Sequence, residues 1–383
     1  MPPPSQPSTQ PRRPRPSPSP WRLAFGVLSS PRLAIALLVA VLASCIVGVT
    51  VFIGARAGEV IFSTLWFNGL LVALALSSGL TFFPRIWGRT LNMVSVGMIV
   101  FHISFMAMLG GVVFNSLFQF TGVLRLTEGE TLPTGDHTSY DTIEMGRLFD
   151  FSRLHGETTL IKMHVGFKVD GQDKRAAYEI AVGEGASRTS GTIYVTQNLD
   201  HDGVRYLVAK EGYSLGVILH DRQGKELNAL MVPLQSLPQG KNAFIYTTGT
   251  SKEAAAFPLP PPPDPPLYMV QLQYLPSGEK ERAGQVGYQV WRVTGDGPEL
   301  QGSTGRVVVG GHFPAGEHEI EVGEVRYWVG MTVRHDPGLL VILSSLWAGL
   351  AGMTMTFVGR IMQDAKRGKR EASGRQDGGE PAR

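Results

Sequence analysis

The chain has 383 residues, of which 17% are charged, and a formal net charge of only +3. A charge this small gives no sign of a nucleic-acid-binding protein. The single cysteine, Cys45, excludes an intrachain disulfide framework, a CxxC redox pair and a CxxCH haem-attachment motif. We expect Cys45 to be a small buried hydrophobic residue.

The chain begins with a polar segment. Residues 1–30 are rich in Pro, Ser and Arg and contain no acidic residue. This composition is typical of a disordered tail. The apolar run that follows is too long for a cleaved signal peptide and lacks an Ala-x-Ala site before a soluble domain.

Four stretches contain no Asp, Glu, Lys or Arg. They lie between Arg32 and Arg56, Glu59 and Arg85, Arg89 and Arg125, and Asp336 and Arg360. About 20 apolar residues in a helix cross the roughly 30 Å of hydrocarbon in a bilayer. We therefore predict three membrane-spanning helices within residues 31–118, the third near Leu91–Leu117, and a fourth at 337–360.

The basic residues predict the orientation of these spans. The first tail, the loop with Arg85 and Arg89, and the last segment, 361–383, are all basic. With four spans these three segments share one side, which the positive-inside rule makes the cytoplasm. Both termini are then cytoplasmic, 361–383 is a basic disordered tail, and 119–336 lies outside the cytoplasm.

Residues 119–336 are predicted to form a β-rich domain. Short alternating stretches are separated by turn residues: Lys162–Val169, Thr192–Thr196, Val204–Val208, Met269–Tyr274 and Val325–Val329. His201-Asp202-Gly203 is typical of a hairpin turn. The proline-rich stretch Phe257–Pro266 suggests two halves joined near 257–266. The predicted fold class is a membrane protein with four transmembrane α-helices, three N-terminal and one C-terminal, and a β-rich extracytoplasmic domain.

The histidines of this domain form no recognisable motif. No HExxH or paired metal spacing occurs, and we assign no catalytic residue. We interpret these histidines as polar loop residues: His137, His155, His164, His201, His220, His312 and His318.

His102 lies about halfway along the third predicted span. Polar side chains at this depth are costly and usually face other helices or a cavity. Met98 and Met106 share its helical face, and Gly97, Gly110 and Gly111 permit close approach of a neighbouring helix. His102 is a candidate axial ligand of haem iron. The alternative is a histidine that is hydrogen-bonded between helices.

His335 stands where the chain returns towards the membrane, before Asp336-Pro337-Gly338. It is a second candidate ligand or an interfacial residue, and we favour the interfacial interpretation.

These residues together resemble the ResB family of cytochrome c biogenesis proteins. The resemblance is carried by residues 23–130 and 325–359. It includes Ser30-Pro31-Arg32-Leu33, Phe62-Ser63-Thr64-Leu65-Trp66-Phe67, His102, Gly110-Gly111, Gly122-Val123-Leu124-Arg125-Leu126, Glu128-Gly129-Glu130, Asp336-Pro337-Gly338, Gly352 and Phe357. Ser77-Ser78 departs from the Asn that related chains often have.

The resemblance implies a subunit that handles haem b, bound without a covalent link, and presents it to apocytochrome c. His102 matches the family's transmembrane haem ligand. The six Trp are dispersed, so the tryptophan-rich haem loop is expected on a multi-span cytochrome c assembly partner. The implied location is a bacterial inner membrane, with the large domain periplasmic or extracytoplasmic.

Such a subunit is not expected to be a stand-alone enzyme. Two other functions are compatible with the sequence. One is a non-catalytic scaffold that docks apocytochrome or a redox partner. The other is a divergent subunit of a respiratory complex that carries electrons through a b-type haem.

The orientation is directly testable. Reporter fusions after Arg85 and after Arg360 are expected to report the cytoplasm, because basic segments stay on that side. A fusion near Gly240 is expected to report the opposite side. A cytoplasmic signal from the Gly240 fusion would overturn the topology.

Overall fold

The computed structural model describes residues 25–52, 55–86, 91–174, 176–238, 244–250, 252–277, 282–294, 297–300 and 304–377. The chain separates into two compact units. The helical unit is Met1–Phe118 with Pro337–Arg383, and the β unit is Gln119–Asp336. Each unit is described below by itself.

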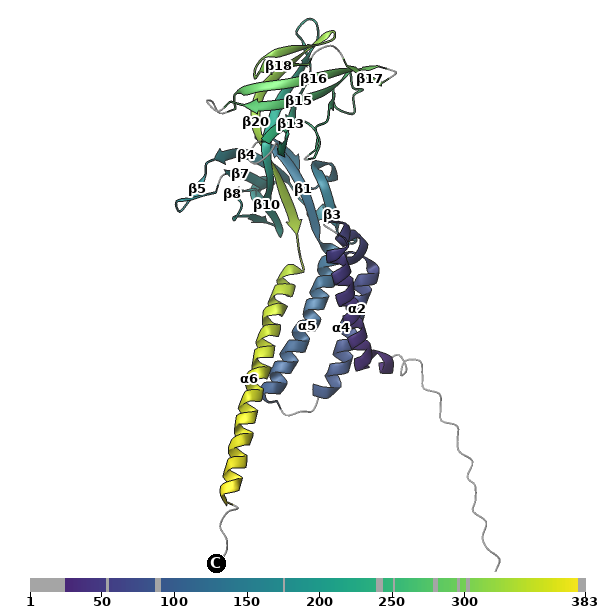
Figure 1. The fold of residues 1–383 in the computed structure, drawn as a ribbon, viewed down its shortest axis with the longest axis vertical. Coiled ribbons are helices and arrows are strands. Elements are labelled where there is room, and N and C mark those ends of the chain that lie inside the picture. Colours follow the sequence, from purple (N-terminus) through teal and green to yellow (C-terminus); the bar gives the residue numbers. More distant parts are fainter. Residues whose placement is uncertain are drawn as a thin grey trace, which may run out of the picture. The chain divides into compact units, whose positions relative to one another are not determined.

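The helical unit contains four long helices (Figure 1): α2 (Pro31–Thr50), α4 (Leu65–Ile86), α5 (Met93–Phe118) and α6 (Leu339–Asp377). The short helix α3 (Ala55–Ala57) and one π-helical turn, η1 (Gly58–Phe62), join α2 to α4. Each long helix contains a segment long and apolar enough to cross a membrane: Pro31–Thr50, Leu65–Phe82, Met93–Phe118 and Leu339–Gly368. The four apolar helices predicted from the charge-free stretches are thus confirmed as helices.

The last helix continues well past its apolar part. We expected 361–383 to be disordered, but α6 runs to Asp377. Residues 361–377 are rich in Ala, Lys, Arg, Gln and Glu, which favour helix, and contain no proline. Residues 25–28 are also helical, whereas residues 1–24 of the predicted N-terminal tail and 378–383 of the C-terminal tail lie outside the described residues.

The β unit is built from antiparallel strands in three sheets and one small hairpin. The first sheet has the order β11-β10-β20-β1-β3, with β9 paired to β10 and β19 paired to β20. Its strands are β1 (Phe120–Thr127), β3 (Tyr140–Met145), β9 (Leu199–His201), β10 (Val204–His220), β11 (Glu226–Pro233), β19 (His312–Ala315) and β20 (His318–His335).

The second sheet has the order β12-β13-β15-β16-β17, with β14 paired to β15 and β18 paired to β16. Its strands are β12 (Gln235–Pro238), β13 (Phe244–Thr247), β14 (Phe257–Leu259), β15 (Tyr268–Pro276), β16 (Gly284–Thr294), β17 (Gly297–Leu300) and β18 (Gly305–Val308). The third sheet, β2-β4-β7-β8, and the hairpin β5-β6 complete the unit. These strands are β2 (Thr131–Pro133), β4 (Glu157–Val165), β5 (Lys168–Val169), β6 (Gln172–Asp173), β7 (Ala176–Gly183) and β8 (Thr189–Ile193). Three single turns of 3-10 helix lie at His137–Ser139, Phe151–Arg153 and Gly185–Ser187.

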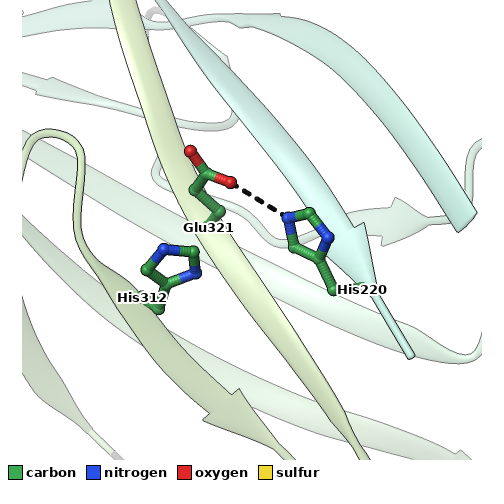
Figure 2. Close-up of side chains that lie close together, drawn as sticks. All are labelled: His220, His312 and Glu321. Carbon is green, nitrogen blue, oxygen red and sulfur yellow. Dashed lines mark hydrogen bonds and ion pairs between the residues drawn. The ribbon is translucent and has the colours of Figure 1, made fainter. Parts of the chain in front are cut away.

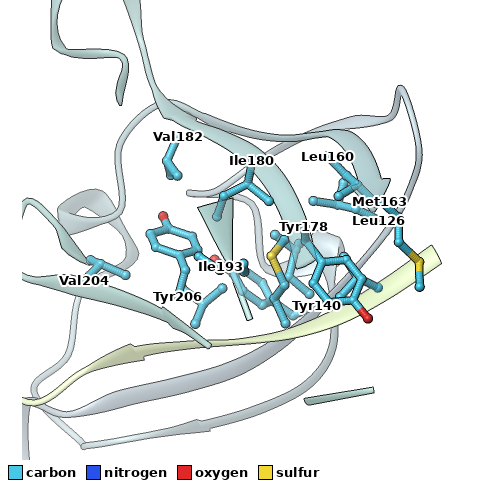
Figure 3. Packing of buried hydrophobic residues seen from close by; sticks show 14 of the residues in the cluster. Leu126, Tyr140, Leu160, Met163, Tyr178, Ile180, Val182, Ile193, Val204 and Tyr206 are labelled. Carbon is cyan, nitrogen blue, oxygen red and sulfur yellow. The ribbon is translucent and has the colours of Figure 1, made fainter. Parts of the chain in front are cut away.

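Two hydrophobic cores share the long strands β10 and β20. The first core packs β1, β4 and β7 against one end of this strand pair, and Figure 3 shows its side chains, among them Tyr178, Ile180 and Tyr206. The second core packs the second sheet against the other end of the pair, through residues such as Leu219, Val270 and Ile320. Tyr213 lies opposite Tyr327 and Leu215 lies opposite Val325. Residues two apart on a strand share a face, so the two cores follow one another along the strands rather than lying on opposite faces of the pair.

The proline-rich stretch does not join two halves, in contrast to our expectation. Its first residues form β14, which pairs with β15 in the second sheet, with Pro258 opposite Met269. Leu259 is fully buried in the second core. Proline is tolerated in β14 because this strand lies at the margin of the sheet. On the side of β14 that faces away from β15, a missing N–H donor interrupts no hydrogen bonds between strands.

The hairpin predicted at His201-Asp202-Gly203 is confirmed. His201 of β9 pairs with Val204 of β10, and Asp202 and Gly203 have positive φ angles of 48° and 73°. These angles are those of a two-residue type I′ turn, for which Asp-Gly is a preferred sequence.

Glu128, which directly follows β1, is a buried acid with several partners. Its carboxylate accepts a hydrogen bond from the Met163 N–H at 2.8 Å and forms an ion pair with Arg282 at 2.9 Å. Its backbone carbonyl accepts from Arg326 Nη1 at 3.1 Å. Because these partners come from β4, β20 and the segment before β16, Glu128 holds distant parts of the chain together.

Replacing Glu128 by Ala is expected to destabilise the β unit by roughly 3 kcal/mol, because it removes the buried carboxylate that pairs with Arg282 and accepts from the Met163 N–H. The denaturation midpoint of the purified chain measures this loss. Glu226→Gln, at an exposed position of β11, is the matched control and should leave the midpoint unchanged. Equal midpoints for Glu128→Ala and the control would contradict a structural role for Glu128.

Candidate functional site

His102 sits within α5, which is apolar along its whole length and has no acidic residue in its first turn. The ring nitrogen Nδ1 lies 2.9 Å from the carbonyl oxygen of Met98, one helical turn earlier. A carbonyl only accepts hydrogen bonds, so Nδ1 carries the proton in the neutral ring. The second nitrogen, Nε2, then has an unprotonated lone pair, and the described residues offer it no hydrogen-bond donor.

Two aromatic rings hold the imidazole of His102. Phe82 of α4 stacks on it with ring centroids 3.3 Å apart and an interplanar angle of 8°. Phe101 meets it edge-on, with centroids 5.2 Å apart. Together with the bond to Met98, these contacts fix the ring's orientation while Nε2 stays available as a metal ligand.

The predicted sulfur neighbours of His102 have packing roles. The sulfur of Met106 lies so close to Gly79 of α4 that a Cβ there would meet it at 2.8 Å. Met98 contributes its backbone carbonyl to His102. Neither contact calls for a sulfur ligand, so packing and the backbone bond account for both residues.

On another face of α5, small residues form a close contact with α6. A Cβ added at Gly97 would lie 2.6 Å from the Gly352 carbonyl, and one at Gly111 would lie 3.1 Å from Ile342. Gly338 is packed equally tightly against Asn115, whose Oδ1 accepts a hydrogen bond from the Gly338 N–H at 3.1 Å. The predicted close approach is therefore seen at Gly97 and Gly111, whereas a Cβ at Gly110 would have open space.

A small cavity lies between α5 and α6. It has a volume of about 100 Å³ and is lined by residues such as Phe101, Ser104 and Gly349. Ligand pockets usually measure roughly 300–1,000 Å³, so this cavity does not by itself hold a large cofactor. Among the described residues that line it, His102 does not occur.

A larger cavity of about 350 Å³ lies in the β unit, lined by residues such as Glu211, Tyr213 and Tyr246. Glu211 accepts a hydrogen bond from the Tyr178 hydroxyl. Burial, together with this carboxylate, raises the pKa of Tyr178. The cavity therefore offers aromatic faces together with one acid, a combination suited to binding a peptide segment or a polar aromatic group.

His335 lies at the end of β20, opposite Phe120 of β1. Its Nδ1 lies 2.9 Å from the Gly203 carbonyl, which makes Nδ1 the protonated nitrogen. Its Nε2 is buried and has no hydrogen-bond partner among the described residues. His102 and His335 thus share one chemical feature, an imidazole fixed by a carbonyl, but they belong to different units.

Cys45 is half-buried and packs against the apolar cluster formed by α2, α4 and α5. Ser77, in the segment where the sequence departs from related chains, is fully buried. Its hydroxyl donates to the Leu28 carbonyl at 2.8 Å. Both residues are therefore explained by packing within the helical unit.

The chain matches the model of a known protein family. Residues 92–362 fit the model of the ResB-like family. The chain belongs to the ResB-like family. No curated protein matches the chain.

The family match begins at the start of α5 and ends within α6, so it includes His102, the whole β unit and His335. It confirms the resemblance to ResB and supports involvement in cytochrome c biogenesis. The match also covers residues 131–324, which lie outside the segments that carry the sequence resemblance, and it leaves out the first two predicted spans.

The contact between α5 and α6 generates a prediction. A methyl group at Gly352 would lie 2.7 Å from the Phe101 backbone nitrogen, so Gly352→Ala is expected to push the helices apart and destabilise the chain by about 1–3 kcal/mol. Gly110→Ala, in the same helix pair but with open space, is the control. Thermal melting in mild detergent compares the two, and equal melting temperatures would argue against the close contact.

Proposed function

We propose that this chain binds haem b as cargo through His102 and presents it outside the cytoplasm for attachment to apocytochrome c. The observation that carries the proposal is the imidazole in the middle of α5 with Nδ1 bound to Met98 and Nε2 unprotonated. Neutral imidazole with a free Nε2 is the form that ligates haem iron.

The surroundings of His102 fit this cargo in chemistry. Phe82 and Phe101 supply apolar ring surface next to the ligand nitrogen. The Met98 carbonyl holds the proton on Nδ1 and so keeps Nε2 as the donor to iron. Nε2 of His102 would hold the haem iron, while Met98, Phe82 and Phe101 orient the imidazole ring.

The chain is expected to act with a partner. It has one cysteine and no tryptophan-rich loop, so it lacks the groups that would complete haem attachment. Little of the long helices is covered: 22% of the α5 span and 11% of the α6 span are buried. This exposed apolar surface supports contact with lipid and with a multi-span cytochrome c assembly protein that carries the haem loop.

The proposed location is a bacterial inner membrane, with the β unit periplasmic or otherwise extracytoplasmic and both termini cytoplasmic. Four apolar helices and the basic segments that flank them support this placement. In this arrangement His102 lies within the membrane, where it can hold cargo between the two sides.

A second function is supported by the β unit. The 350 Å³ cavity beside Glu211 and Tyr213 is of the size of ligand pockets, which favours a scaffold that docks apocytochrome or a redox partner. In that function His102 is a packing residue that stacks on Phe82. Haem content separates the two functions.

The decisive experiment is His102→Ala in the chain purified with its partner from native membranes. Haem per chain, from the absorption spectrum normalised to protein, is expected to fall to a small fraction, because the axial nitrogen is lost. Cytochrome c maturation in the same cells should fall with it. Added imidazole is expected to restore part of both, since it can occupy the vacated axial position.

His335→Ala is the comparison, and a milder effect is expected if His335 is interfacial. Normalising to protein separates loss of haem from loss of the chain, and imidazole rescue requires a folded chain. Full haem occupancy and normal cytochrome c levels in His102→Ala would reject the ligand assignment and favour the scaffold.

A further inference from the structure

Three side chains from distant parts of the sequence meet at one end of the first sheet (Figure 2). They are His220, the last residue of β10, His312, the first residue of β19, and Glu321 near the start of β20. β20 pairs with both neighbours here: His312 lies directly opposite Glu321, and His220 lies opposite Glu319. Since residues two apart on a strand share a face, Glu321 is on the same face as His220 and His312.

The opposite face of these strands is anchored in the second core. The sequence neighbours of the three residues are Leu219, Phe313 and Ile320, whose side chains face the second core and are essentially buried. This burial fixes the strand backbones and therefore the direction of the three polar side chains. His220 and Glu321 are themselves half-buried, with 16% and 27% of their side chains exposed, whereas His312 is exposed.

The ligand atoms are close together. Nε2 of His220 lies 3.0 Å from Oε2 of Glu321, and one ligand atom from each of the three residues lies within 4.8 Å of the other two. Ligand atoms on a tetrahedral zinc ion are about 3.4 Å apart at usual bond lengths. His312 is exposed, so its side chain is not fixed by the core and can adjust to a bound ion. No other group of three potential ligand residues is this close among the described residues.

We propose that His220, His312 and Glu321 bind one divalent transition-metal ion of the zinc type. Two imidazole nitrogens and one carboxylate are a ligand set that zinc accepts, and three protein ligands leave a fourth position for water or another donor. Imidazole also suits copper and nickel, so zinc is the reference ion and the others are competitors. This site is separate from His102, and it does not depend on the proposed haem function.

The charges around the site favour a cation. Glu319 is exposed on the same face, cross-strand from His220, and adds negative charge beside Glu321. Asp221 is engaged in its own turn, where it accepts from the N–H groups of Gln223 and Lys225. His318 is hydrogen-bonded through Nδ1 to the Tyr268 hydroxyl at 2.9 Å and does not belong to the cluster of close ligand atoms.

The bound ion would connect the β19–β20 hairpin to β10, which lies about ninety residues earlier in the chain. β19 is a short strand whose pairing partner within the described part of the chain is β20. An ion held by His312, Glu321 and His220 would tie this strand to β10 as well. The site therefore predicts that zinc stabilises the end of the β unit around the second core.

The test is zinc binding to the full-length chain, purified in detergent with a tag that contains no histidine. Equilibrium dialysis against Zn²⁺ with elemental analysis is expected to give one ion per chain. Glu321→Gln and His312→Ala should each weaken binding at least about tenfold, because each removes one of three ligands. Both positions lie on the outer face of the sheet, so the substitutions leave the second core intact.

His155→Ala is the matched control, because His155 is an exposed histidine of the same unit. The zinc affinity of this variant is expected to equal that of the unmodified chain. Zinc should also raise the melting temperature of the unmodified chain and the control, but not of Glu321→Gln. Zinc binding that is absent, or that is unchanged by both ligand substitutions, would overturn the site and leave His220 and Glu321 as a simple hydrogen-bonded pair.

Discussion

The β unit depends on one interaction, the antiparallel pairing of β10 with β20. The pairing runs from Arg205 opposite Arg334 to His220 opposite Glu319, with irregularities between Val208 and Lys210 and between Leu215 and Val217. Bulges of this kind bend a strand and increase its twist. Each end of the pair thereby serves a different core, and each end also carries a histidine of interest: His335 at one end and His220 at the other.

Glu128 and His102, two polar residues within the ResB-like match, differ in how many of their polar atoms have partners within the chain. Glu128 has its carboxylate oxygens occupied by Met163 and Arg282 of the same chain, so its contacts account for its presence. His102 has one nitrogen bound to Met98 and the other without a donor among the described residues. The contacts of His102 within the chain therefore leave Nε2 for the proposed haem iron, whereas those of Glu128 use both carboxylate oxygens.

The spans and His102 could be predicted because they depend on local sequence: absence of charge over about 20 residues, and one imidazole within such a run. The helical end of α6 was missed because charge was taken as a sign of disorder, although Lys, Arg and Glu favour helix. The set of His220, His312 and Glu321 could not be predicted. Its members meet only through the register of β10, β19 and β20, and no local pattern encodes that register.

The glycine contact between α5 and α6 also has a consequence for the order of assembly. Residues 119–336 are synthesised after α5 and before α6, so Gly97 and Gly111 have no neighbour in α6 until the entire β unit has left the ribosome. β1 and β10 likewise wait for β20, which is translated just before α6. Such long-range contacts form slowly. Both units are therefore completed only when β20 and α6 have been synthesised. A chain truncated before β20 would lack β20, the partner of β1 and β10, and α6, the partner of α5.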